Sequence, residues 1–600
     1  MQTVAEYIAE KLYEAGVRDA FMITGGFSMP LTEALTRLGK IKYICMHHEQ
    51  AATMAAEAYG RRTGRLGAAY ITAGPGATNA LTGVVGAWVD AGPSIVIAGQ
   101  GKLAQARVTG VRQFPLQGFE TLPIYKLVTK YAVMITDPGR VRYEIEKALF
   151  LATHGRAGPA WVEVPLDLQA ARMDPAAQQG FDPASEGLGE SVADEMMRAA
   201  VRRTAALLRD SRRPVVLAGA GVRDADAVGE FDNFIQTLNI PFVTSRLGMD
   251  LAGHDHPLFV GRPGTYGDRP ANTAIQNSDV LLVFGCRLGV GLVGHDYDDF
   301  ARYSRKIVVD IDPSELGKPS MDAMKVDERV CGDLRIFMRL LLDELGSWRF
   351  GGAKWIAKTQ EWKHRYVVDD PSYAAEKEGV NSYHFTRVLS DRLGPDAVCV
   401  LDTGSCFHVW AQAFKVKKGQ RHVITGGLST MGYMPASIGV AAASPGRDVF
   451  CMTGDGSIQM NLQELQTIVH YKLPVKLLVL DNDGYLLIRW TQKNFFGQRR
   501  WGEGPETGVT VPEPGKLCGA YGLKFIRITS GADMERGIEE MLQHKGPVWL
   551  NVHTPRWQIL QPRVASEKLA DGTMRSKPYD DMFPFLPRDE YEANCVRNIS

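Results

Sequence analysis

Short apolar runs alternate with segments of helical spacing along most of this chain, and no other feature restricts its fold as strongly. Near the N-terminus, apolar runs occupy residues 20–23, 43–46, 68–71 and 94–98, with helical patterns over 50–59 and 78–89. Strands that alternate with helices form parallel sheets with helices on both faces. The sequence therefore predicts an α/β fold of doubly wound parallel sheets.

Two stretches that lose the apolar period divide the chain into three such blocks. Residues 171–189 are rich in Ala, Pro, Gln, Gly, Ser and Glu, and the pattern weakens again around residues 351–373. We interpret both stretches as connectors. The expected domains are 1–172, 190–346 and 375–555, followed by an irregular, polar tail over 556–600.

Composition and charge exclude several classes of protein. Lys and Arg (68) balance Asp and Glu (68), so no global positive field would hold a nucleic acid. The longest apolar stretches fall short of the roughly 20 residues that a membrane helix needs, and the N-terminus lacks the pattern of a secretory signal. The eight cysteines form no CxxC pair, which favours reduced core thiols. We expect a cytoplasmic protein.

The strongest indication of a functional site comes from two consecutive apolar runs. An aspartate between two glycines follows the first run, and an asparagine lies at the end of the second. Gly454-Asp455-Gly456-Ser457 follows the first run and Asp481-Asn482 ends the second. A right-handed crossover can make these strands neighbours, which would bring Asp455 and Asn482 together. Mg²⁺ prefers such oxygens with phosphate, and glycines let the backbone approach a diphosphate. Gly-Asp-Gly alone is also an ordinary turn, but its spacing to Asn482 favours a metal-bridged diphosphate.

Further loops between a strand and a helix outline a ligand-binding rim. His47-His48-Glu49-Gln50 carries an acid, while Thr24 to Ser28 and Ala73 to Asn79 are rich in glycine. Taken alone, Glu49 is better explained as an acid that is favoured at a helix start, but the neighbouring glycine-rich loops weaken that explanation. The two histidines lack a third ligand at zinc spacing, which argues against zinc. A last loop, Gly426 to Gly432, contains Met431, whose commoner use is to fill core space.

Together these motifs resemble those of the thiamine-diphosphate enzymes of the acetolactate synthase group. The motifs that carry the resemblance are Gly454-Asp455-Gly456 with Asp481-Asn482, His48-Glu49-Gln50-Ala51-Ala52, Gly74-Pro75-Gly76-Ala77-Thr78-Asn79 and Gly427-Leu428-Ser429-Thr430-Met431-Gly432. The resemblance implies that the N-terminal domain binds the pyrimidine of the cofactor and that the C-terminal domain binds its diphosphate. A central domain lies between them in the sequence. The resemblance also implies an active site between subunits, hence a homodimer or homotetramer.

The resemblance also assigns roles to single residues. Asp455, Asn482 and the backbone carbonyl of Gly484 would bind Mg²⁺. Glu49 would hydrogen-bond the pyrimidine ring and promote deprotonation of C2 of the thiazolium. Met431 would hold the two rings bent together, and the carbonyl of Ser429 would accept from the exocyclic amine. Further cofactor-binding residues would be Pro75, Asn79, Gly404, Ser405, Gly454, Gly456, Ser457 and Tyr485, and Gly26, Phe27 and Gln117 would join Glu49 as catalytic residues.

The chain departs from the family pattern in the central domain. Acetolactate synthases place an arginine, which grips the acceptor carboxylate, shortly after a strand end, where this chain has Gly289-Val290-Gly291-Leu292. We therefore expect an uncharged aldehyde or ketone to be a better acceptor than a second pyruvate, unless Arg287 or Arg489 replaces that arginine. The same stretch lacks side chains that surround FAD in the family, whereas Gly219-Ala220-Gly221 and Asp310-Ile311-Asp312 leave flavin binding open.

Several functions remain open from the sequence. The leading hypothesis is a carboligase that decarboxylates a 2-oxo acid, pyruvate by family default, and transfers the acyl unit to an acceptor carbonyl. A simple 2-oxo acid decarboxylase and a true acetolactate synthase are alternatives, and a non-catalytic scaffold is a remote one. Ser566 to Gly572 with Tyr579 to Met582 resembles the tail of relatives from surface-polysaccharide and unusual-sugar synthesis, but a tail that packs over a subunit explains it equally.

Overall fold

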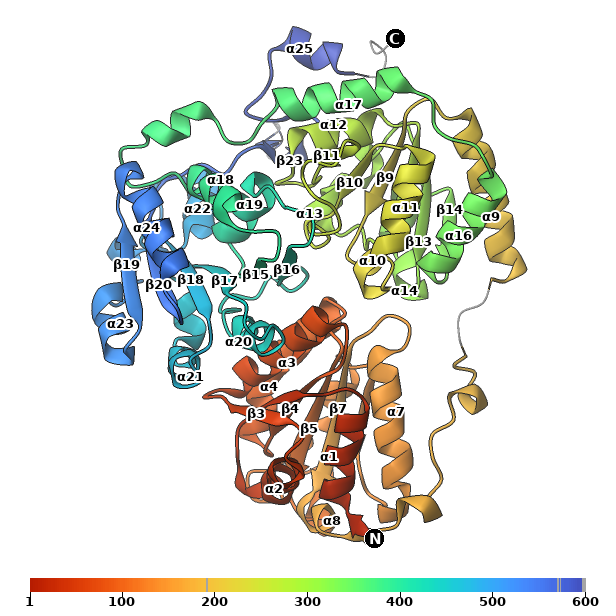
Figure 1. The fold of residues 1–600 in the computed structure, drawn as a ribbon, viewed down its shortest axis with the longest axis vertical. Helices are drawn as coiled ribbons and strands as arrows, with labels where there is room; N and C mark the ends of the chain where they lie inside the picture. The colour runs from red at the N-terminus through yellow and green to blue at the C-terminus, as the bar shows by residue number, and fades with distance from the viewer. Residues whose placement is uncertain (190–192, 569–570, 572, 596–600) are drawn as a thin grey trace. The chain divides into compact units, whose positions relative to one another are not determined.

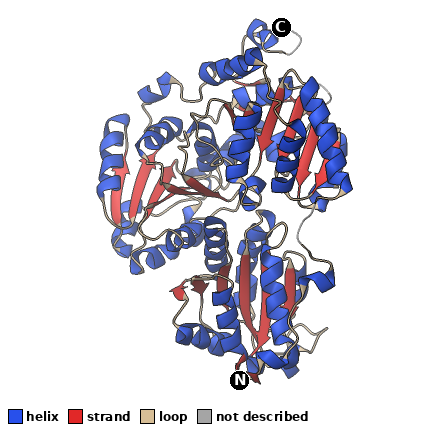
Figure 2. Cartoon of the chain, turned by 45° about the vertical axis from the view of Figure 1, so that its right-hand side comes forward, coloured by secondary structure: helices blue, strands red, loops and turns tan. Residues whose placement is uncertain are grey.

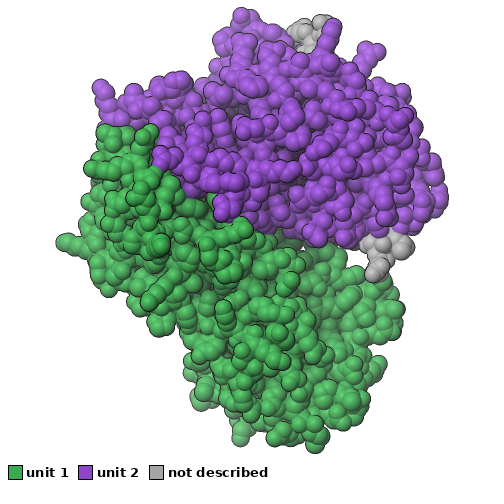
Figure 3. Space-filling view, viewed as in Figure 1, with its two compact units in different colours: residues 1–189, 397–406, 423–556 green, residues 190–396, 407–422, 557–600 purple. Residues whose placement is uncertain are grey.

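The computed structural model describes residues 1–189, 193–568, 571 and 573–595. The chain divides into two compact units, unit 1 with residues 1–189, 397–406 and 423–556 and unit 2 with residues 190–396, 407–422 and 557–600 (Figure 3). Within the described residues, the long parallel strands form three sheets of six strands each. Helices cover both faces of each sheet (Figures 1 and 2). The predicted α/β class with three domains is confirmed.

The N-terminal sheet has the strand order β3-β2-β4-β5-β7-β6. Its strands are β2 (Asp19–Met22), β3 (Lys42–Cys45), β4 (Gly67–Ile71), β5 (Ser94–Gln100), β6 (Tyr131–Met134) and β7 (Pro159–Pro165), and its longer helices are α1 (Val4–Glu14), α2 (Met29–Leu38), α3 (Glu49–Thr63), α4 (Pro75–Val89) and α7 (Val141–Thr153). A capping box of Thr3 and Glu6 begins α1. Pro75 begins α4, where a proline costs no hydrogen bond.

The sheet of the third domain repeats this topology, with the order β16-β15-β17-β18-β20-β19. Its strands are β15 (Val398–Leu401), β16 (Arg421–Ile424), β17 (Val449–Gly454), β18 (Val475–Asp481), β19 (Lys524–Ile528) and β20 (Val548–His553), and its helices are α18 (Ser382–Arg392), α19 (Ser405–Ala413), α20 (Ala436–Ala442), α21 (Glu464–His470), α22 (Leu486–Phe496), α23 (Pro514–Tyr521) and α24 (Gly531–Gln543). As predicted, β17 and β18 are parallel neighbours.

Both of these domains contribute to one hydrophobic core within unit 1. Helix α3 supplies buried alanines such as Ala51, Ala52 and Ala55, and α20 supplies Ala436 and Ile438. The two helices come so close that a Cβ on Gly439 would lie 1.9 Å from the carbonyl oxygen of Ala55. Small residues on α3 and α20 thus fix how the two sheets of unit 1 are joined.

The central sheet, in unit 2, has the order β11-β10-β9-β12-β13-β14. Its strands are β9 (Pro214–Ala218), β10 (Phe242–Thr244), β11 (Phe259–Gly261), β12 (Val280–Phe284), β13 (Arg305–Asp310) and β14 (Glu328–Cys331), and helices of unit 2 include α9 (Glu195–Asp210), α11 (Val228–Leu238), α12 (Arg269–Asn277), α13 (Val290–Val293), α16 (Leu334–Leu345) and α17 (Ala353–Arg365). Numbered along the chain, this order is that of nucleotide-binding doubly wound sheets.

Two expectations about connectors and cysteines need correction. The second connector contains the 13-residue helix α17, whose Trp355 and Trp362 are buried and pack edge to face. Two tryptophans seven residues apart anchor this helix although its other faces are polar, which is why the apolar period looks weak. All eight cysteines are free, but Cys45 and Cys331 are exposed rather than in the core.

The tail packs on the central domain within unit 2. Tyr579 is buried in the central hydrophobic core, Asp580 pairs with Arg302, and a short helix, α25 (Arg588–Ala593), follows. Leu569, Ala570 and Gly572 of the tail motif lie outside the described residues. No helix among the described residues is long and apolar enough to cross a membrane.

Candidate functional site

The topology of unit 1 predicts where a ligand would bind. In both of its sheets the order in which strands are added reverses between the first and third strands, which are β2 and β4 in one sheet and β15 and β17 in the other. Ligands of open parallel sheets bind outside the carboxyl ends of the strands at this reversal. The loops there contain Gly25 to Ser28, Thr72 to Pro75, Asp402 to Ser405 and Asp455 to Ser457. The sequence motifs therefore fall at the positions that the topology favours.

Asp455 lies directly after β17 and is 4% exposed. Its Oδ1 accepts a hydrogen bond from the backbone N–H of Gly456 (2.8 Å), and its Oδ2 accepts from those of Gly484 (2.8 Å) and Asn482 (3.3 Å). Burial nevertheless raises the pKa of Asp455 to about 7, although these N–H groups oppose the shift. A buried carboxylate without a cationic partner is costly, so the site favours a cation.

Asn482 begins the loop after β18 and is also 4% exposed. Its side-chain Oδ1 is buried and has no hydrogen-bond partner among the described residues, a situation that is rare for a buried acceptor. Together with Asp455, this oxygen forms a set of hard ligands suited to Mg²⁺. Among the described residues, no three His, Cys, Asp or Glu side chains cluster as a metal site would require, so any metal here would need amide or carbonyl oxygens as further ligands.

A fully buried ion pair holds the loop that contains Asn482 and Gly484. Arg489 and Glu503 have no exposed side-chain surface and are 2.6 Å apart. Arg489 also donates to the backbone carbonyls of Asn482 (3.2 Å) and Asp483 (2.8 Å). Arg489 is therefore a structural residue of the loop, and the suggestion that it could grip a substrate carboxylate is wrong. No sequence pattern indicates this role, because Glu503 lies in an irregular segment.

A second buried acid, Asp402, connects three loops of the third domain. Its Oδ2 accepts from the hydroxyls of Thr453 and Ser457, both at 2.8 Å, and Ser457 in turn accepts from the N–H of Gly432 (2.9 Å). Burial raises the pKa of Asp402. The predicted residues Gly404 and Ser405 follow directly. Asp402 was not among the predicted residues, although its position after β15 matches that of Asp455 after β17.

Glu49 is the first residue of α3 and is 8% exposed. The preceding His48 caps the helix, since its Nδ1 accepts from the N–H of Gln50 (3.1 Å). Asn79 donates to Oε2 of Glu49 (3.0 Å), and a Cβ on Gly76 would lie 3.4 Å from Oε1. The structure thus brings together two predicted cofactor residues, Glu49 and Asn79, from α3 and α4.

The glycines of the N-terminal domain allow close packing of its loops. Gly74 has φ +65°, and a Cβ there would lie 1.9 Å from the carbonyl oxygen of Gln117, so only glycine fits. The backbone of Gln117 therefore packs on the loop that begins α4, with its own φ at +59°. Gly26 is exposed and Phe27 half-buried, and the carbonyl of Phe27 accepts from Gln169 (2.6 Å).

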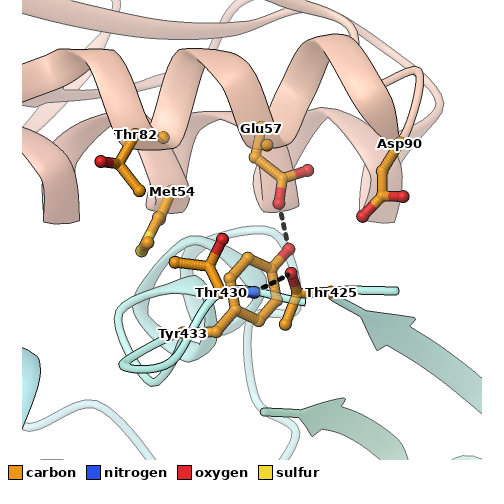
Figure 4. A pocket seen from close by; sticks show the side chains of 9 residues that line it. Met54, Glu57, Thr82, Asp90, Thr425, Thr430 and Tyr433 are labelled. Carbon is orange, nitrogen blue, oxygen red and sulfur yellow. Dashed lines mark hydrogen bonds between the residues drawn. The ribbon is translucent and has the colours of Figure 1, made fainter. Parts of the chain in front are cut away.

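The loop with Ser429 and Met431 is held by acids of the N-terminal domain, all within unit 1. Asp90, at the end of α4, accepts from the N–H groups of Gly427 (2.8 Å) and Gly426 (3.1 Å). Tyr433 donates to Glu57 on α3. Figure 4 shows both acids above the loop, where they line a small pocket with Met54, Thr82, Thr425 and Thr430. The backbone of Ser429 is left-handed, with φ +53°.

The predicted residues form two groups within one chain. One group surrounds Glu49 at the N-terminal sheet, and the other surrounds Asp455 at the third sheet. In the part of the chain that the structure describes, no hydrogen bond links Glu49 or Asn79 to Asp455, Asn482 or Gly484. Tyr485 packs beside the second group, because a Cβ on Gly456 would lie 2.4 Å from its ring.

Comparison with known proteins matches three parts of the chain to three domain models of one family. Residues 2–120 match the N-terminal TPP binding domain of thiamine pyrophosphate enzymes, residues 201–341 their central domain and residues 402–552 their C-terminal TPP binding domain. The acetolactate synthase large subunit of Porphyra purpurea is 29% identical over 94% of this chain and 93% of its own length. That of Parasynechococcus marenigrum is 31% identical (94% and 89%), and the probable acetolactate synthase large subunit of Methanocaldococcus jannaschii is 31% identical (91% and 91%).

Proposed function

The chain belongs to the thiamine pyrophosphate enzymes as an acetolactate-synthase-like member, and we propose that it decarboxylates pyruvate and transfers the acyl unit to an acceptor carbonyl. The observation that carries the proposal is the pair of buried oxygens at the end of β17 and β18, the Asp455 carboxylate and the unpartnered Oδ1 of Asn482. Both are hard oxygen ligands that would hold a divalent cation, which in turn would favour a diphosphate nearby.

Each group of residues has its own part in the proposal. Asp455, Asn482 and the carbonyl of Gly484 would hold Mg²⁺, and Arg489 keeps their loop in place. When bound, thiamine diphosphate supplies a carbon nucleophile and stabilises the negative charge left by the loss of CO₂. Glu49, held by Asn79, would keep a proton at the pyrimidine ring.

The remaining assignments follow the family pattern. Met431 and Ser429 would position the two rings of the cofactor, and Gly26, Phe27 and Gln117 would act beside the reacting carbon. The other proposed cofactor contacts are Pro75, Gly404, Ser405, Gly454, Gly456, Ser457 and Tyr485. The domain bounds 1–172, 190–346 and 375–555, with the tail 556–600, belong to the same proposal.

We propose a homodimer or homotetramer, because one segment of the N-terminal domain carries several exposed apolar side chains. Phe114, Leu116 and Leu127 are 56%, 75% and 78% exposed, and exposed apolar side chains that form a patch often mark an interface. FAD is a weaker part of the proposal, because the stretch Gly289 to Gly291 lacks side chains that surround flavin in the family. The cytoplasm remains the expected compartment, consistent with eight free cysteines.

Binding measurements test the metal and cofactor assignment. Equilibrium dialysis of thiamine diphosphate, with and without Mg²⁺, should show metal-dependent binding that Asp455→Asn reduces severely. Asp483→Asn is the matched control, because Asp483 is exposed and lies on the same loop outside the ligand set. Equal, metal-independent binding by the wild type and Asp455→Asn would refute the assignment. If cofactor binds but pyruvate yields acetaldehyde alone, the protein is a decarboxylase.

A further inference from the structure

The chain over residues 45–49, here the Glu49 loop, leaves the N-terminal sheet at its edge. β3 is the edge strand and lies next to β2. The N–H of Met46 donates to the carbonyl of Met22 on the β2 side (3.0 Å). Because backbone N–H groups alternate in direction along an edge strand, those of Cys45 and His47 point away from the sheet. They need hydrogen-bond partners from another element.

Helix α21 of the third domain supplies both partners, and all of these residues belong to unit 1. The hydroxyl of Tyr471, at the end of α21, accepts from the N–H of Cys45 (2.9 Å). Oε1 of Glu464, the first residue of α21, accepts from the N–H of His47 (2.9 Å). The two ends of one helix therefore hold the backbone that leads to Glu49.

Glu464 is a fully buried acid whose partners are uncharged donors. Its Oε2 accepts from the hydroxyl of Thr467 (2.7 Å), and no lysine or arginine among the described residues forms an ion pair with it. Burial raises the pKa of Glu464, although its hydrogen bonds with Thr467 and the N–H of His47 oppose the shift. Burying an acid without a charged partner costs stability, and proteins accept such costs chiefly at functional sites.

The same helix follows the loop that contains the proposed metal ligand. A short 3₁₀ helix, Ile458–Asn461, leads from the loop of Asp455 to α21. Leu465 and Ile468 of α21 pack in the same hydrophobic core as Met46 of the Glu49 loop. Packed residues therefore connect the Asp455 loop, α21 and the Glu49 loop within unit 1.

We propose that Glu464 is a positioning residue for Glu49. It fixes the backbone at His47, while Asn79 holds the Glu49 carboxylate itself (3.0 Å). The inference rests on the proposed function, because Glu49 needs a bound cofactor to act on. A displacement of about 1 Å can cost about a hundredfold in rate, so loss of the contact with His47 should slow deprotonation of the cofactor rather than prevent its binding.

Deuterium exchange at C2 of thiamine diphosphate, measured by NMR on the full-length protein saturated with cofactor and Mg²⁺, tests the proposal. Glu464→Ala removes the acceptor for the N–H of His47, and we expect exchange to be about ten- to a hundredfold slower. Its affinity for the cofactor, measured by equilibrium dialysis, should stay close to that of the wild type. Glu464→Gln keeps a carbonyl oxygen for the N–H and should restore most of the rate.

Glu144→Ala is the matched control for a purely structural effect. Glu144 is also a buried acid in the first turn of a helix, α7, but its partners, Arg140 and Tyr131, lie outside the Glu49 loop. Both Glu144→Ala and Glu464→Ala remove hydrogen bonds of a buried group and should melt lower than the wild type. Only Glu464→Ala should exchange more slowly.

Three results would overturn the inference: exchange at the wild-type rate in Glu464→Ala, exchange as slow in Glu464→Gln as in Glu464→Ala, or a loss of cofactor binding in Glu464→Ala as severe as in Asp455→Asn. If Glu464→Ala does not fold, Glu464→Asp decides by the same criterion, because it keeps the charge but draws the carboxylate back from His47. A wild type that binds no thiamine diphosphate would refute the proposed function, and this inference with it.

Discussion

The buried polar groups at the proposed site differ in whether the protein itself supplies their charged partners. Arg489 and Glu503 satisfy each other inside the protein, whereas Asp455 has only backbone N–H partners. Asp455, Asn482 and Glu49 could be predicted because each lies at the end of an apolar run. Arg489 could not, because its partner Glu503 comes from a segment without a periodic pattern, and Asp402 was missed although it too follows an apolar run. A polar residue at the end of an apolar run therefore marks a candidate position, and the roles of Asp455, Asn482 and Glu49 stay predictions.

Glu49→Gln tests the proposed proton role of this acid. The amide can still accept from Asn79 but is a much weaker proton donor, so the cofactor should bind while deuterium exchange at its C2 slows. Positioned proton transfer is worth about 10²- to 10⁴-fold in rate. The measurement is NMR of the cofactor recovered after timed exposure to D₂O. Exchange at the wild-type rate would show that Glu49 only stabilises the start of α3.

At the scale of helices and strands, the length and clarity of the apolar pattern determined which elements could be predicted from the sequence. The buried strands β4, β5, β9 and β12 are continuous apolar runs, and the sequence placed them correctly. β10 and β11 have three residues each, which is too short for a detectable apolar run. β6 is only half-buried, so its sequence does not form a clear apolar run either. The contacts of Asp90 with the loop of Met431 could not be predicted either, because they join elements that are far apart in the sequence.

Asp90→Asn should loosen that loop without unfolding the protein. The amide offers one acceptor where the carboxylate served both Gly426 and Gly427, and losing a charge-assisted hydrogen bond costs about 1.5–3 kcal/mol. We expect faster hydrogen exchange at residues 426–432 and roughly tenfold weaker binding of thiamine diphosphate. Asp137→Asn, an exposed cap in the same domain, is the control. Unchanged exchange in the loop would exclude the anchoring role.

Asp250 forms a buried ion pair in unit 2 whose stability depends on pH. Burial alone would raise its pKa, but Arg421 and Arg223 outweigh burial and hold the pKa well below its usual range. The stabilisation is therefore complete above the unfolded-state pKa of about 3.9 and is lost as the pH falls toward the folded-state value.

Asp250→Asn should consequently melt lower than the wild type at pH 7, by the equivalent of about 3–5 kcal/mol for a broken buried pair, and the difference should shrink below about pH 4. Asp232→Asn is the control, because its pair with Lys418 is exposed on the lysine side and contributes little. A difference in melting temperature that stays constant from pH 7 to pH 3 would contradict the assignment.

At the scale of the whole molecule, one chain contains both halves of the proposed site but does not join them by hydrogen bonds. In the proposed homodimer, Glu49 of one subunit would lie opposite Asp455 of the other. Co-expression of Glu49→Gln with Asp455→Ala should then restore activity, because each mixed dimer combines an intact Glu49 with an intact Asp455. With random pairing, about a quarter of all sites would be intact. Activity no higher than that of either variant alone would show that each site belongs to a single chain.

The central claim is that the protein joins an acyl unit from pyruvate to an acceptor. The most direct test is mass spectrometry of the products from carbon-13-labelled pyruvate, incubated with aldehydes, keto acids and nucleotide-linked keto sugars, with and without thiamine diphosphate and Mg²⁺. We predict a coupled product that contains the labelled acyl unit and forms only when both cofactors are present. Labelled acetaldehyde as the sole product with every acceptor, or coupling that does not need thiamine diphosphate, would contradict the claim.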